Sequence, residues 1–199
     1  MSGMSDVLGL AVDEMQSALT PALDRSWEVR AGDVEWTCRA TASHVADDLF
    51  SYASQVIAQP ERGYLPIEAV MEPRATNAEI LRAVAMCGRL LSNAVDSTPA
   101  HARAWHPYGT SDPEGFAAMG IVEVLVHTFD IATGLELDWR PPSTLCAPVI
   151  DRLFPGAPAG GASPVLLHVT GRRALAGTEL QTTWAWDSTV RTDPGTRYP

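Results

Sequence analysis

The sequence predicts an all-α protein built around a four-helix bundle. Four segments have the length, and the three- and four-residue spacing of apolar side chains, that amphipathic helices require. No segment before residue 164 shows the alternation of apolar and polar residues that marks a strand. The 199 residues are 46% hydrophobic and 19% charged, which suits one soluble domain with an appended extension.

The first two predicted helices cover residues 5–23 and 33–58. The first carries a continuous apolar stripe. The second begins at an Asp33 cap, continues through Trp36 and stops before Pro60. This assignment places Trp36 on an apolar helix face, where core packing is its expected role.

The third and fourth predicted helices have clearer start signals. Thr76 followed three residues later by Glu79 is a capping-box pattern, and the helix that it opens ends near "DSTP". The fourth helix enters at Pro113 or Glu114 after a loop rich in His, Pro and Gly. It stops at Gly134, which is placed for a left-handed C-cap.

These four helices make residues 1–136 the bundle. Residues 137–199 form a C-terminal extension that we expect to pack on the bundle and not to fold as an independent domain. The extension contains a possible helix, "STLCAPVIDRLF", and a linker, "PGAPAGGASP". The following "VLLHVTGRRALAGTELQTTWAW" fits either a short helix with a turn or two short strands.

Charge and cysteine usage exclude several classes of protein. The net charge of −10 disfavours binding to nucleic acid or to anionic membranes. Cys38, Cys87 and Cys146 form no CxxC pair, so each is expected to be a small buried residue in a reducing compartment. The N-terminus lacks the features of a signal peptide, and no window has the roughly 18 apolar residues of a spanning helix. The expected location is the cytoplasm.

The fourth helix carries a polar stripe inside an apolar run, "IVEVLVHTFDI". Glu123, His127 and Asp130 recur at spacings of three and four residues, so they share one face. Because the rest of the helix is apolar, this face points into the protein, where ionisable groups persist only when they are paired or bound to a cation. The second helix offers partners at the same spacing, His44 and Asp48.

If these two helices face each other, His44, Glu123 and His127 bring two imidazole nitrogens and one carboxylate together. Such a set is common around catalytic zinc and also suits nickel or iron. Asp48 and Asp130 would then hold the imidazoles by accepting their second N–H. The same five residues also fit a metal-free hydrogen-bond network that fixes the register of the helices.

The quoted motifs resemble a known family. The order of four helices, with "WTCRATASHVADDLFSYA" on the second and "GIVEVLVHTFDIATGL" on the fourth, resembles the DinB-like superfamily. Within it, the chain is similar to the N-terminal domain of mycothiol-dependent maleylpyruvate isomerases over roughly residues 5–136. The resemblance implies that a divalent metal, typically zinc, is bound by His44, Glu123 and His127. The ending "LLHVTGR" is similar to endings of short actinobacterial members.

The resemblance also implies chemistry. Its members use a low-molecular-weight thiol such as mycothiol, and the expected function is a metal-dependent S-transferase or isomerase acting on an electrophilic small molecule. Two alternatives remain open, a non-catalytic metal-stabilised binding or interaction protein and a metal-dependent hydrolase. Maleylpyruvate isomerases carry a larger C-terminal domain than the extension here, which argues against maleylpyruvate as the substrate.

Two arginines are candidates for binding an anionic group of the substrate or thiol, since guanidinium groups pair well with carboxylates. They are Arg172 in "TGRR" and Arg82 on the third helix; a solvated surface position is the alternative for each. The expected partners are a small-molecule substrate and a thiol, and a homodimer is compatible with the resemblance.

Overall fold

The structure, a computed structural model, describes residues 3–190 and contains six α-helices and no strand in that range. The bundle is formed by α1 (Met4–Leu19), α2 (Cys38–Ala58), α3 (Asn77–Ser97) and α4 (Pro113–Gly134). A 3-10 turn, Thr20–Ala22, follows α1. The extension contains α5 (Ser143–Leu153) and α6 (Ala162–Val169). The all-α prediction is confirmed.

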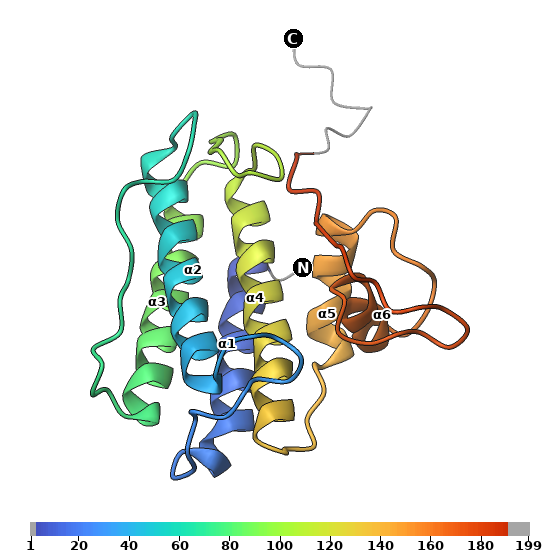
Figure 1. Cartoon of the computed structure of the whole chain (residues 1–199). Helices are drawn as coiled ribbons and strands as arrows, with labels where there is room; N and C mark the ends of the chain where they lie inside the picture. Colours follow the sequence, from blue (N-terminus) through green and yellow to red (C-terminus); the bar gives the residue numbers. More distant parts are fainter. Residues whose placement is uncertain (1–2, 191–199) are drawn as a thin grey trace.

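The four long helices pack around one apolar core. Both α1 and α2 contact α3 and α4, and residues 59–76 run the length of the bundle between α2 and α3 (Figure 1). Outside the bundle, α5 packs against α4 and α6 packs against α5. The two alternatives for the chain after residue 164 are resolved in favour of a short helix with a turn, and the option of short strands is wrong within residues 3–190.

The central helix, α4, is enclosed on all sides. Every residue from Gly115 to Ala132 is buried. By length and composition α4 is apolar enough to cross a membrane, so the expectation that no window reaches this level was wrong. Because 94% of that window is buried inside the protein, α4 is accounted for as a core helix.

Start signals were predicted well for two helices and wrongly for a third. The capping box at Thr76 and Glu79 is present, and Pro113 begins α4 behind an Asp112 side chain that caps Gly115 N. However, α2 begins at Cys38 with Thr37 as its N-cap, and not at Asp33. Residues 30–37 form a tight loop in which Ala31 N donates to Trp36 O at 2.9 Å.

The prediction of a left-handed cap at Gly134 was also wrong. Gly134 is still helical, and the left-handed residue is Glu136, with φ of 55°. A Cβ at position 134 would collide with the Arg30 carbonyl oxygen and lie 2.9 Å from Cys38 Sγ. Gly134 is therefore suited to this position because it lets the 30–37 loop approach the end of α4.

Candidate metal centre

The polar stripes of α2 and α4 face each other in the bundle. Glu123, His127 and Asp130 are buried on α4, while His44 and Asp48 lie half-buried on α2. The imidazole rings of His44 and His127 are 5.2 Å apart between centroids, at 78° to each other. The predicted approach of the two helices at these residues is therefore present.

Three of these side chains converge on one point. One nitrogen of His44, one of His127 and a carboxylate oxygen of Glu123 all lie within 4.8 Å of one another. Within residues 3–190 this is the one group of three or more His, Cys, Asp or Glu side chains with such a geometry. The donor set suits a borderline cation such as Zn²⁺, which takes imidazole and carboxylate ligands together. The residues present thus fit the metal that the family resemblance implies.

Each imidazole also has a carboxylate partner. His127 Nδ1 lies 3.0 Å from Asp130 Oδ2, and His127 Nε2 lies 3.2 Å from Glu123 Oε2. His44 Nε2 lies 2.9 Å from Asp48 Oδ2. Hydrogen bonds of this kind fix ring orientation and raise the basicity of an imidazole ligand.

The carboxylates set the protonation of the cluster. Burial lowers the pKa of His127, but hydrogen bonds with Asp130 and Glu123 outweigh burial and raise that pKa to about 9. Burial raises the pKa of Asp48 to about 6, with a further contribution from the charge of Glu123. Burial also opposes ionisation of Glu123 and Asp130, yet their bonds with His127 hold the pKa of each below its ordinary value. Without metal, His127 is thus a buried cation between two anions.

Arg172 reaches this cluster from the extension. Its Nη2 donates to Asp130 Oδ2 at 2.9 Å and its Nε to Asp130 Oδ1 at 3.3 Å, a bidentate pair. Its Nη1 donates to Thr170 O at 2.8 Å. The guanidinium is therefore committed to holding Asp130, which in turn holds His127.

The second candidate arginine does not reach the cluster. Arg82 is exposed on α3 and is absent from the residues that line the cleft beside His44 and Glu123. The structure thus supports the alternative considered for Arg82, a solvated surface position.

The cluster opens onto a cleft of about 440 Å³, which we call the tryptophan cleft. Its walls come from the 30–37 loop, from α2 and α4, and from the chain after α6. The lining residues are Val34, Glu35, Trp36, His44, Glu123, His127, Arg172 and Trp184.

Sequence reasoning identified His44, Glu123, His127 and Arg172 but missed the two indoles that line this cleft. Trp36 was expected in the core, but it is 45% exposed and its ring lies 4.6 Å from that of His44. Its position just before the Thr37 cap, eight residues ahead of His44, would have been a usable signal. Trp184 lies in irregular chain, where no periodicity identifies it. Tyr52 on α2 is also buried near this cluster, and burial, followed by the charge of Glu123, raises the pKa of its hydroxyl well above the ordinary value.

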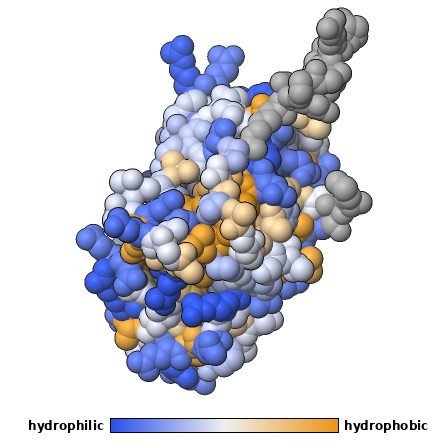
Figure 2. Space-filling view, turned by 90° about the vertical axis from the view of Figure 1, so that its right-hand side faces the viewer, coloured by the Kyte–Doolittle hydropathy of each residue, from blue (hydrophilic) through white to orange (hydrophobic). Residues whose placement is uncertain are grey.

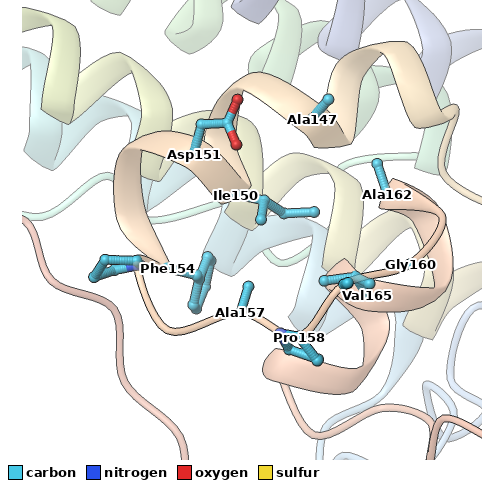
Figure 3. A pocket seen from close by; sticks show the side chains of 11 residues that line it. Ala147, Ile150, Asp151, Phe154, Ala157, Pro158, Gly160, Ala162 and Val165 are labelled. Atoms are coloured by element: carbon cyan, nitrogen blue, oxygen red, sulfur yellow. The ribbon is translucent and has the colours of Figure 1, made fainter.

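Further cavities lie around the bundle and the extension, and two of them are lined by residues of the extension. One, of about 440 Å³, lies between α5, α6 and their linker, and mostly apolar residues together with Asp151 line it (Figure 3). It belongs to the face of α5 and α6, where apolar side chains gather among hydrophilic ones (Figure 2). The other, of about 330 Å³, adjoins the tryptophan cleft, shares Val34, Arg172 and Trp184 with it, and contains Arg173. Among the described residues, neither cavity contains a second group of three metal-binding side chains.

These features define an all-α bundle with a two-histidine, one-carboxylate cluster between its second and fourth helices. The family model described as the mycothiol maleylpyruvate isomerase N-terminal domain matches residues 8–132, and the chain belongs to this family. The match covers most of α1 and all of α2 and α3, and it contains His44, Glu123 and His127. No curated protein and no solved structure matches the chain.

Proposed function

We propose that this protein is a metal-dependent enzyme that uses a low-molecular-weight thiol, of the mycothiol type, against an electrophilic small molecule. The observation that carries the proposal is the convergence of His44, Glu123 and His127 beside an open cleft. Three protein ligands leave a coordination position for a fourth. The family to which the chain belongs supports the choice of a thiol.

In this proposal His44, Glu123 and His127 hold a divalent cation, zinc first, with nickel or iron as alternatives. When bound, such a cation favours the thiolate form of a thiol, which is the nucleophile. Asp130, fixed by Arg172, orients His127, and Asp48 orients His44. The cleft supplies the space for the second reactant beside the two indoles.

The thiol can take part in either of two reactions, a transfer or an isomerisation. In a transfer, a sulfur–carbon bond forms, the bond from that carbon to its leaving group breaks with the electron pair on the leaving group, and the thiol proton passes to solvent. In an isomerisation, the thiol adds to a carbon–carbon double bond and is later eliminated unchanged, so that only the geometry of the double bond differs. The chain's own residues position the reactants in either case.

The first test is metal content by elemental mass spectrometry on tag-free protein. We expect about one equivalent of divalent metal in the wild type and in His101→Ala, an exposed control, and none in folded His127→Ala. A folded wild type that takes up no metal on reconstitution would overturn the proposal. It would leave the buried network of His127 and its carboxylates as a purely structural device.

The second test separates thiol chemistry from hydrolysis by the same three residues. Turnover of a panel of electrophiles is measured with and without thiol. Turnover that depends on thiol concentration supports the proposal. Turnover at full rate in the absence of any thiol would identify a hydrolase in which water occupies the open position.

A further inference from the structure

The tryptophan cleft has one polar wall and one apolar wall. The candidate metal ligands form the first, and the indoles of Trp36 and Trp184 contribute to the second. Single exposed aromatic side chains are common on protein surfaces and need no explanation. Two partly exposed indoles that line the same cleft, beside the same cluster, are a feature that a ligand can use.

The surrounding structure holds both indoles in place. Trp36 lies in the loop closed by the Ala31 N to Trp36 O hydrogen bond, and its ring rests against that of His44. Trp184 packs on Gly171, where a Cβ would lie 3.1 Å from its Cδ1. The guanidinium of Arg172 lies 5.4 Å from the centre of the Trp184 ring. The apolar wall is therefore built before any ligand arrives, which lowers the entropy cost of binding.

The cleft offers no uncommitted side-chain cation among its described lining residues. Arg172 is the one arginine there, and its charge is paired with the Asp130 carboxylate through two hydrogen bonds, while a third N–H donates to Thr170 O. The rim adds a carboxylate, Glu35, to that of Glu123. The guanidinium of Arg173 lines the adjoining cavity and not the cleft itself. A carboxylate brought into this cleft would be desolvated without a side-chain cation to receive it.

We propose that the tryptophan cleft selects a flat, uncharged, ring-containing electrophile that packs against Trp36 and Trp184, and disfavours dianionic acids. Calling the ligand an electrophile rests on the proposed function. Its preferred shape and charge rest on the cleft walls alone. The volume of about 440 Å³ accommodates one or two small rings beside the candidate metal centre.

Two probes of the same shape and different charge test this selection by calorimetry. 1,3-Dinitrobenzene is flat and uncharged and has no leaving group, while isophthalate places two carboxylates at the same ring positions. Both chelator-treated and zinc-supplemented wild-type protein are titrated. We expect 1,3-dinitrobenzene to bind at least about tenfold more tightly than isophthalate to both forms of the protein. Equal or tighter binding of isophthalate to either form would overturn the proposal.

Substitutions test the role of the indoles. We expect Trp36→Leu and Trp184→Leu each to weaken 1,3-dinitrobenzene binding about three- to tenfold, and Trp36→Phe to retain most of it. The matched control is Trp139→Leu, because Trp139 bonds Glu14 and does not line the cleft. Unchanged binding in both leucine variants at the cleft would contradict the proposal.

A separate measurement distinguishes failure of this inference from failure of the proposed function. His127→Ala is expected to lose metal and still bind 1,3-dinitrobenzene, because the ring packs on the apolar wall. Selective ring binding in a protein that never takes up metal would uphold the cleft and reject the metal-dependent chemistry. Metal uptake without any preference for the uncharged ring would do the reverse.

Discussion

At the scale of single residues, the centre depends on a chain of side chains that ends outside the bundle. Arg172 holds Asp130, Asp130 holds His127, and His127 faces Glu123 and His44. Glu123, His127 and Asp130 are more than nine-tenths buried, and the side chain of Arg172 is 11% exposed. Water is therefore not available to these groups as an alternative partner. Removing one carboxylate is therefore expected to change the orientation and the metal affinity of the imidazole to which it is hydrogen-bonded.

The first prediction concerns Asp130→Asn. An amide cannot accept two hydrogen bonds from Arg172 as a carboxylate does. It also lacks the negative charge that favours the proton on His127 Nδ1, which leaves the lone pair of Nε2 available beside Glu123. We expect zinc affinity, measured by competition with a chromogenic chelator, to fall about 10- to 100-fold. Asp138→Asn, an exposed change after α4, is the control and should leave affinity unchanged. An unaltered affinity in Asp130→Asn would show that Asp130 does not support the centre.

The second prediction concerns pH and the metal-free protein. The pKa of folded His127 is about 9, above the ordinary 6.5, so its protonated form stabilises the fold fully below about pH 6.5. This contribution is lost as pH rises through 9. We expect the urea midpoint of chelator-treated wild type to fall between pH 6 and 9.5, and that of His127→Gln to fall less. Parallel curves for the two proteins would contradict the assignment.

At the scale of helices, close approach of backbone explains where α4 ends and where α2 begins. Gly134 lets the Arg30 carbonyl and Ala31 lie against the last turn of α4. That contact positions the loop that carries Trp36 and delays the start of α2 to Cys38. The geometry of the cleft is thus tied to a glycine in the adjacent helix end.

The third prediction compares two glycines in helices. Gly134→Ala places a methyl group against Arg30, Ala31 and Cys38, and we expect it to destabilise the protein by about 1–3 kcal/mol. Gly9→Ala on α1 meets nothing within 4 Å and should stabilise by roughly 0.5–1 kcal/mol. Urea unfolding measures both. A neutral Gly134→Ala would mean that the 30–37 loop moves away at little cost.

The elements also show which parts of the fold a sequence encodes locally. The capping box at Thr76 and Glu79 and the entry at Pro113 involve residues within one turn, so the pattern predicted them correctly. Asp33 and Thr37 are both good N-cap residues, and packing of the loop on Gly134 decides between them. A local pattern does not contain that contact.

In the candidate site, too, contacts that follow from helical spacing were predicted, and contacts made by irregular chain were not. The meeting of His44 with Glu123 and His127 followed from helical periodicity, because both stripes had to find partners inside the protein. The pairing of Arg172 with Asp130 and the place of Trp184 depend on how irregular chain after α6 folds back. No repeat of three or four residues marks such positions.

At the scale of the whole molecule, the extension is fastened to the bundle by polar contacts as well as by apolar packing. Arg152 on α5 donates to Asp112 Oδ1 at 3.1 Å, at the start of α4, and to Ser188 O at 3.2 Å in the last described segment. Asp187 N donates to Leu153 O at 2.9 Å. One side chain thus joins three stretches that are far apart in the sequence.

The fourth prediction tests this connection with Arg152→Met. We expect a loss of about 1.5–3 kcal/mol, because charged hydrogen bonds disappear and Asp112 loses its positively charged partner. Hydrogen exchange should quicken in residues 108–112 and 186–190 and stay unchanged in α3. Arg89→Met, an exposed change on α3, serves as the control. Unaltered exchange near residue 188 would show that apolar packing alone fastens the extension.

The division of the tryptophan cleft between two parts of the chain affects how such a protein can diverge. The candidate metal ligands belong to α2 and α4, while Arg172 and Trp184 belong to the segment that follows α6. Mutations in residues 173–186 can therefore remodel the cleft wall while the candidate metal ligands on α2 and α4 stay unchanged. A library randomised at these positions would therefore be the natural starting point for changing which ligands the cleft accepts by directed evolution.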